Sequence, residues 1–79
     1  MKVPRDVNAD DFIKLLVRYG YVVIRQSGSH IRLSKQTSKG EHVITVPNHN
    51  TIKIGTLQSI VKDVCNVNML DIQSLYSQL

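Results

Sequence analysis

The apolar and polar positions change their period several times along the chain. Between residues 8 and 20, one set of apolar side chains recurs at three- and four-residue spacing: Phe12, Ile13, Leu16 and Tyr19. This spacing predicts an amphipathic helix. Asn8 precedes acidic residues and is suited to begin the helix, and Gly20 is suited to end it.

Three segments suited to β-strands follow this helix. They are residues 21–26 (YVVIRQ), 29–35 (SHIRLSK) and 41–46 (EHVITV). The first is rich in β-branched residues, and the second alternates strictly between apolar and polar positions, as half-buried strands do. A polar loop, QTSKG, separates the second from the third, and Pro47 closes the third.

The helical period returns in the last third of the chain. One face collects Leu57, Ile60, Val61 and Val64. A further stripe, from Met69 to Leu79, predicts a short third helix that begins near Asn68. We therefore predict one α+β domain over residues 1–79, ordered α-β-β-β-α-α, with an arm at 1–7 and a C-terminal helical extension at 66–79. Its three-stranded antiparallel sheet would carry helices on one face and leave the other face open.

A hairpin loop of two residues at Ser27-Gly28 would determine how the first two strands pair. Arg25 would then lie opposite His30, and Val23 opposite Arg32. The apolar members of both strands would face the core: Val22, Ile24, Ile31 and Leu33. His30, Arg25 and Arg32 would share the open face near the turn.

The chain is basic, with ten Lys and Arg against six Asp and Glu and a net charge of +4. This excess favours a polyanionic partner such as nucleic acid, although many small proteins are mildly basic without one. A single cysteine excludes an internal disulfide and favours the cytoplasm. With no apolar run long enough for a signal peptide or a membrane span, we expect a cytoplasmic protein without a membrane partner.

His30 follows a glycine turn and lies among cations. An imidazole can accept or donate a proton near neutral pH, and Arg25 and Arg32 can attract and neutralise a phosphate. Gly28 and Ser29 are small enough to let an RNA backbone approach. These groups suffice to cleave RNA without a metal. Equally, His30 can be an exposed polar residue and the arginines can be solubilising charges.

Other residues are weaker candidates. Lys35, beside the polar loop, and Lys53, ahead of a helix N-terminus, can contact phosphate. His49 is a candidate general acid or phosphate contact, but we favour a role in fixing its loop by a hydrogen bond to backbone. We expect His42 at the surface or an edge and Cys65 in the core. The spacing of the histidines and Cys65 matches no zinc motif, so we expect no metal and no cofactor.

Three short motifs occur in order along the chain: RQxGSH at 25–30, VPxH at 46–49 and GTLxxI at 55–60. Over roughly Phe12 to Val64 the sequence resembles the HicA toxins, small mRNA-cleaving proteins of toxin–antitoxin modules. It departs from that pattern at Tyr21, where the family often has Trp, and at Ile31, where it commonly has His or another polar residue.

The resemblance implies a fold like that of double-stranded RNA-binding domains and a ribosome-independent endoribonuclease with His30 as its catalytic residue. It also implies a HicB-like antitoxin that covers the active face, within a higher-order toxin–antitoxin complex. We therefore expect a type II toxin that cleaves mRNA. The alternatives are a non-catalytic RNA-binding module of the same fold, with His30 as one contact among several, and a protein-interaction domain whose charge is incidental.

Overall fold

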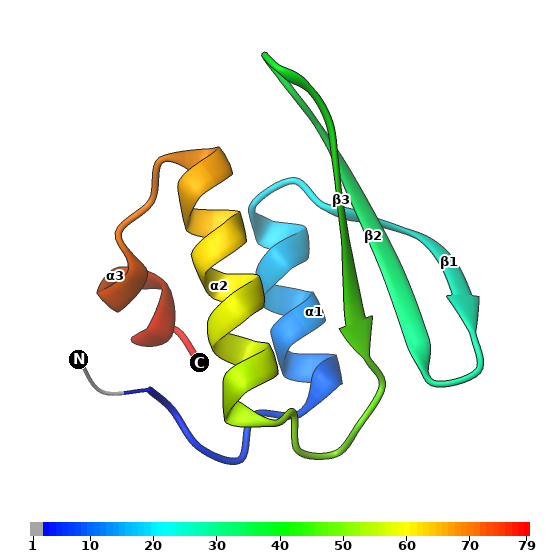
Figure 1. The fold of residues 1–79 in the computed structure, drawn as a ribbon, viewed down its shortest axis with the longest axis vertical. Helices are drawn as coiled ribbons and strands as arrows, with labels where there is room; N and C mark the ends of the chain where they lie inside the picture. The colour runs from blue at the N-terminus through cyan, green and yellow to red at the C-terminus, as the bar shows by residue number, and fades with distance from the viewer. Residues whose placement is uncertain (1–2) are drawn as a thin grey trace.

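The order of elements agrees with the predicted α+β fold. The computed structural model describes residues 3–79 and contains three helices and three strands in that range (Figure 1). These are α1 (Ala9–Arg18), β1 (Val22–Ser27), β2 (His30–Thr37), β3 (Gly40–Pro47), α2 (Ile54–Asn68) and α3 (Ile72–Tyr76). The strands form an antiparallel sheet in the order β1-β2-β3.

The helices lie on one side of the sheet, and the hydrophobic core fills the space between the two layers (Figure 1). Fully buried side chains come from all three helices and from the two later strands, and they include Phe12, Leu16, Leu33, Val46, Val61, Val64 and Leu75. By contrast, every residue of β1 is exposed. The other face of the sheet is left open, as predicted.

Local signals explain where the helices begin and end. The Asn8 side chain accepts a hydrogen bond from the Asp11 N–H at 2.8 Å and caps α1, as predicted. The helix predicted from the apolar face of Leu57 to Val64 runs from Ile54 to Asn68, and Met69 ends it in a left-handed conformation with φ 55°. The last helix begins only at Ile72, after the Asp71 cap, and is shorter than predicted.

The predicted pairing of β1 with β2 is wrong. The structure places Ser27 opposite His30 and Arg25 opposite Arg32, so the turn is Gly28-Ser29 rather than Ser27-Gly28. Gly28 takes φ 57°, and a two-residue turn with glycine first matches the twist of a hairpin. A β-bulge between Val23 and Arg25 then shifts the start of β1, and Ile24 has no partner on β2.

The side chains of β1 therefore do not contribute to the core. Val22 and Ile24, which we expected to face the helices, are 62% and 54% exposed. Ile31 and Leu33 of β2 are buried as predicted.

A chain of hydrogen bonds joins α2 to the sheet on its helical side. The Tyr21 hydroxyl lies 2.6 Å from His42 Nδ1, and His42 Nε2 lies 3.1 Å from the Asp63 carboxylate. Because a carboxylate only accepts, Nε2 carries the proton and Nδ1 accepts from Tyr21. Asn68 Nδ2 also donates to the Tyr21 oxygen at 3.0 Å. His42 is thus a half-buried link between layers rather than a free surface residue.

We expect Tyr21→Phe to destabilise the fold by about 1–3 kcal/mol, because it leaves His42 Nδ1 and the Asn68 amide without their buried partner. Urea unfolding of the variant and the wild type measures the difference. Tyr19→Phe is the control, since the Tyr19 hydroxyl accepts only an exposed bond from Gln78, which water can replace. Equal losses of unfolding free energy in the two variants would contradict a structural role for the buried hydrogen bonds of Tyr21.

The fold should lose stability in alkaline solution. Burial raises the pKa of the Cys65 thiol above 9.0 and those of the Tyr21 and Tyr76 hydroxyls above 10.0. The folded state thus favours their neutral forms. These three groups contribute fully to the free energy of unfolding at pH values below their unfolded-state pKa. The contribution is lost as the pH rises through their higher folded-state pKa values. We expect the urea midpoint to fall above about pH 9, and less steeply in Tyr21→Phe. A urea midpoint that stays constant from pH 8 to 11 would contradict this prediction.

Candidate functional site

The open face of the sheet holds a hollow of about 370 Å³. Side chains from all three strands line it: Arg25, Ser27, His30, Arg32 and Thr45. Three of these residues were candidates from the sequence, and the structure brings them together. Ser27 and Thr45 were not predicted.

The sheet register places these side chains in two adjacent rows. His30 lies between Ser27 of β1 and Pro47 of β3, and Arg32 lies between Arg25 and Thr45. Directly opposite residues have Cβ atoms about 5 Å apart, and the two rows are about 6.7 Å apart along the strand. One phosphodiester group can therefore reach the imidazole and both guanidinium groups at once.

The pairing of Arg25 with Arg32 is unfavourable in itself, because like charges directly opposite each other destabilise a sheet. No acidic residue lines the hollow. On the same face, the Glu41 carboxylate accepts a hydrogen bond from Ser34 at 2.6 Å instead. Within residues 3–79, no Lys or Arg side chain is ion-paired with a carboxylate, and Asp63 instead accepts a hydrogen bond from His42, so neither arginine is neutralised. A bound anion would relieve this repulsion.

The turn beside the hollow is open to solvent. Gly28 and Ser29 are both exposed, and a Cβ added at Gly28 would meet no atom within 4 Å. The Ser29 carbonyl accepts the Asn48 N–H at 2.6 Å, which ties the turn to the segment after β3. The turn is thus held in place by this hydrogen bond, and its solvent-facing side is unobstructed.

The two candidates in the segment after β3 lie outside the hollow. His49 lines a separate hollow of about 220 Å³ beside the start of α1. Its carbonyl accepts the Ala9 N–H at 3.1 Å, so its backbone attaches this segment to α1. Lys53 is exposed and immediately precedes α2.

Lys35 lies on the helical side of the sheet. It pairs with His42 of β3, and its ammonium group donates a hydrogen bond to the Asn68 side chain. The same group lies 5.8 Å from the centre of the Tyr21 ring. The structure therefore separates Lys35 from His30 and the arginines.

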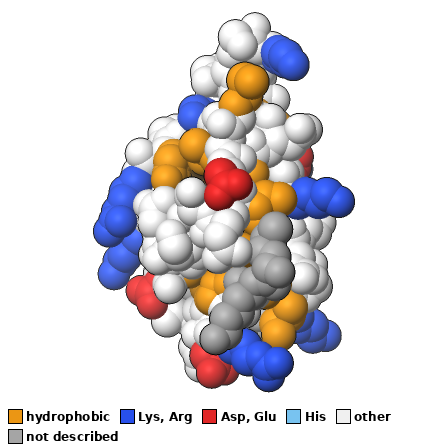
Figure 2. All heavy atoms as spheres, turned by 90° about the vertical axis from the view of Figure 1, so that its left-hand side faces the viewer, with side chains coloured by type: hydrophobic (Ala, Val, Ile, Leu, Met, Phe, Trp, Pro, Cys, Tyr) orange, Lys and Arg blue, Asp and Glu red, His pale blue; other side chains and the backbone are white. Residues whose placement is uncertain are grey.

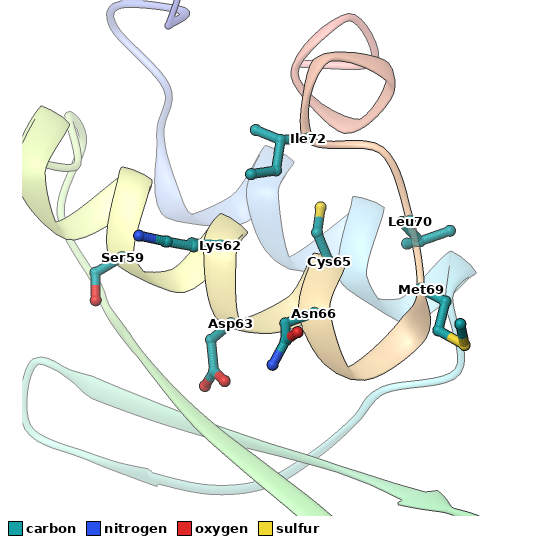
Figure 3. Close-up of a pocket in the computed structure, with 8 residues that line it drawn as sticks. All are labelled: Ser59, Lys62, Asp63, Cys65, Asn66, Met69, Leu70 and Ile72. Carbon is teal, nitrogen blue, oxygen red and sulfur yellow. The ribbon is translucent and has the colours of Figure 1, made fainter.

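A larger hollow, of about 900 Å³, lies between α2 and the segment that leads to α3 (Figure 3). The Cys65 sulfur points toward Ile72 there, whereas Asp63 and Asn66 project from α2 toward the strands (Figure 3). Burial raises the pKa of the Cys65 thiol, which keeps it protonated and unreactive at neutral pH. This hollow is larger than the one around His30, but its buried thiol is not suited to catalysis.

The helical side of the molecule differs in charge from the hollow around His30. Figure 2 shows apolar side chains between scattered basic and acidic ones on that side. No helix within residues 3–79 has the length and hydropathy needed to cross a membrane.

Comparison with known proteins places the chain in a family. A family model described as the HicA toxin of bacterial toxin–antitoxin systems matches residues 9–64, which is more than half of the chain. The matched range includes all five residues that line the hollow. No match was found among curated proteins, and none among solved structures.

Proposed function

Because the chain belongs to the HicA toxin family, we propose that it is an endoribonuclease that cuts mRNA at the hollow around His30. One observation carries this proposal: an exposed imidazole shares a hollow with two arginines that no acidic side chain neutralises. Such a site attracts a phosphodiester and supplies a group that can transfer a proton beside it.

The proposed reaction is an internal transesterification. The 2′-oxygen of the RNA attacks the adjacent phosphorus while the bond to the 5′-oxygen breaks. The products are a 2′,3′-cyclic phosphate and a 5′-hydroxyl end. His30 takes the proton from the 2′-hydroxyl or gives one to the departing 5′-oxygen, and water serves in the other role. Arg25 and Arg32 stabilise the negative charge that builds on the phosphorane.

Two further hydroxyl groups can orient the phosphate. Ser27 is directly opposite His30, and Thr45 is directly opposite Arg32. Both line the hollow, so their hydroxyls can donate to non-bridging oxygens. Gly28 and Ser29 leave the approach to the hollow open. We assign Lys53 and His49 to contacts with RNA beyond the cleaved bond, and we do not assign Lys35 there, because Asn68 holds its ammonium group.

The donor set favours cleavage without a metal ion. The hollow presents two guanidinium groups, which repel a divalent cation, and no carboxylate to bind one. The guanidinium groups supply the positive charge that a metal ion would provide. We propose that the toxin acts on mRNA in the cytoplasm, independently of the ribosome, and that a HicB-like antitoxin neutralises it within a toxin–antitoxin complex.

A second candidate function is an RNA-binding module without catalysis. In the described part of the chain, the side-chain hydrogen bonds do not include the His30 ring, so no neighbouring group fixes its orientation. A histidine that only contacts RNA needs no such group. Salt-dependent binding to RNA is expected of both functions, and only cleavage distinguishes them.

The test uses purified protein in EDTA with an RNA and a DNA of the same sequence. We expect the protein to bind both, to cut the RNA and to leave the DNA intact, because the DNA lacks the attacking hydroxyl. Induction in growing cells should also arrest growth. Binding that weakens with salt but is never followed by cleavage would favour the module.

A further inference from the structure

The strand β1 exposes an apolar run that the fold does not use. Val22, Val23 and Ile24 are 62%, 44% and 54% exposed. Figure 1 shows β1 at the side of the sheet away from the helices, whereas α1 and α2 pack against β3 at the opposite edge. Three consecutive β-branched residues at a free edge are therefore accessible to another chain.

Exposed edges of this kind are usually protected, because their unpaired N–H and C=O groups can pair with another strand. Lys, Pro or short length commonly blunts such an edge. β3, the opposite edge, buries Ile44 and Val46 in the core. In β1 the bulge at Ile24 disturbs the pairing on the inner side, but the apolar side chains remain on the surface. This difference between the two edges marks β1 as an interaction strand.

Charge indicates which partner fits. Arg25 directly follows the apolar run, and Arg32 lies beside it on the same face. Each chain carries a net charge of +4, so a second copy would bring like charge to this edge. A segment with apolar residues next to acidic ones would complement it.

We propose that β1 is the docking strand for the antitoxin, which adds an extended segment to this edge. Main-chain hydrogen bonds would hold the segment, apolar side chains would cover Val22 and Ile24, and acidic ones would pair with Arg25. The identity of the partner rests on the proposed function of the chain as a toxin. Because Arg25 and Ser27 line the hollow from the same strand, this segment would also close one side of the catalytic hollow.

The first test co-expresses a HicB-like antitoxin with toxin variants. Ile24→Lys and Val22→Lys change the docking strand but no residue of the hollow. Val17→Lys is the matched control, since Val17 is 50% exposed on α1. We expect all three variants to arrest growth when expressed alone. The antitoxin should rescue the wild type and Val17→Lys but not the two β1 variants, whose Kd for purified antitoxin should rise at least tenfold.

Several outcomes would overturn the proposal. One is full rescue of both β1 variants. Another is hydrogen exchange that slows elsewhere in the toxin, but not in β1, when the purified antitoxin binds. A third is a dimer of the toxin alone in sedimentation that Ile24→Lys dissociates, since β1 would then bind a second copy.

Failure of the proposed function gives a different result. The wild type would neither arrest growth nor cut RNA, whereas the effect of the β1 variants on antitoxin binding could still be measured with purified proteins. The two ideas therefore fail separately.

Discussion

Replacing His30 by alanine should reduce the rate of RNA cleavage by at least about 100-fold, the usual contribution of a group that transfers a proton in the transition state. Growth arrest on induction should be lost as well. His30 is exposed and outside the core, so the variant should fold like the wild type. Cleavage is measured on a labelled RNA in EDTA, with circular dichroism as the check of folding.

His49→Ala is the matched control for His30→Ala. His49 is also an exposed histidine, but it lines a separate hollow beside α1. Its loop is attached to α1 through the His49 backbone carbonyl, which accepts the Ala9 N–H, and not through the side chain. Its substitution should change cleavage by no more than a few-fold. If both variants cleave RNA at the wild-type rate, His30 has no catalytic role. If His49→Ala alone loses activity, the active site lies at the start of α1.

Arg32→Gln should have two opposite effects. The rate of cleavage should fall by about 100- to 1000-fold, because a preorganised donor to the phosphorane is removed. The folded state should become more stable by about 0.2–1 kcal/mol, because the like-charge pair with Arg25 no longer exists. Glutamine keeps much of the side-chain length, so the loss is chiefly that of charge. Single-turnover cleavage and urea unfolding measure the two effects.

Lys62→Gln is the control for Arg32→Gln. It removes a cation from the exposed surface of α2, in the helical layer, and Lys62 does not line the hollow around His30. It should leave both cleavage and stability close to those of the wild type. A loss of stability in Arg32→Gln would contradict the conclusion that the arginine pair strains the sheet. An unchanged rate would remove Arg32 from the proposed site.

Much of the fold could be predicted because its signals are local. The spacing of Phe12 and Leu16 and the cap at Asn8 predict α1 from adjacent residues alone. The strict alternation in β2 correctly assigns Ile31 and Leu33 to the core and His30 and Arg32 to the open face. That alternation also places Lys35 on the helical side, and applying it consistently would have removed Lys35 from the predicted site.

The pairing of β1 could not be predicted in the same way. It depends on which two residues form the turn and on a bulge at Ile24, and both follow from backbone geometry rather than from hydrophobic pattern. An apolar run also does not show whether helices will cover it, so the exposure of Val22 and Ile24 was missed. Thr45 joins the hollow only through the pairing of β3 with β2, which the sequence does not specify.

The most direct test of the proposed chemistry is the structure of the cleaved RNA ends. A DNA oligonucleotide with a single ribonucleotide is incubated with the wild type in EDTA, and the products are weighed by mass spectrometry. The proposed site predicts one cut, after the ribonucleotide, that leaves a 2′,3′-cyclic phosphate and a 5′-hydroxyl. Products with a 3′-hydroxyl and a 5′-phosphate that form only when a divalent metal is added would contradict it.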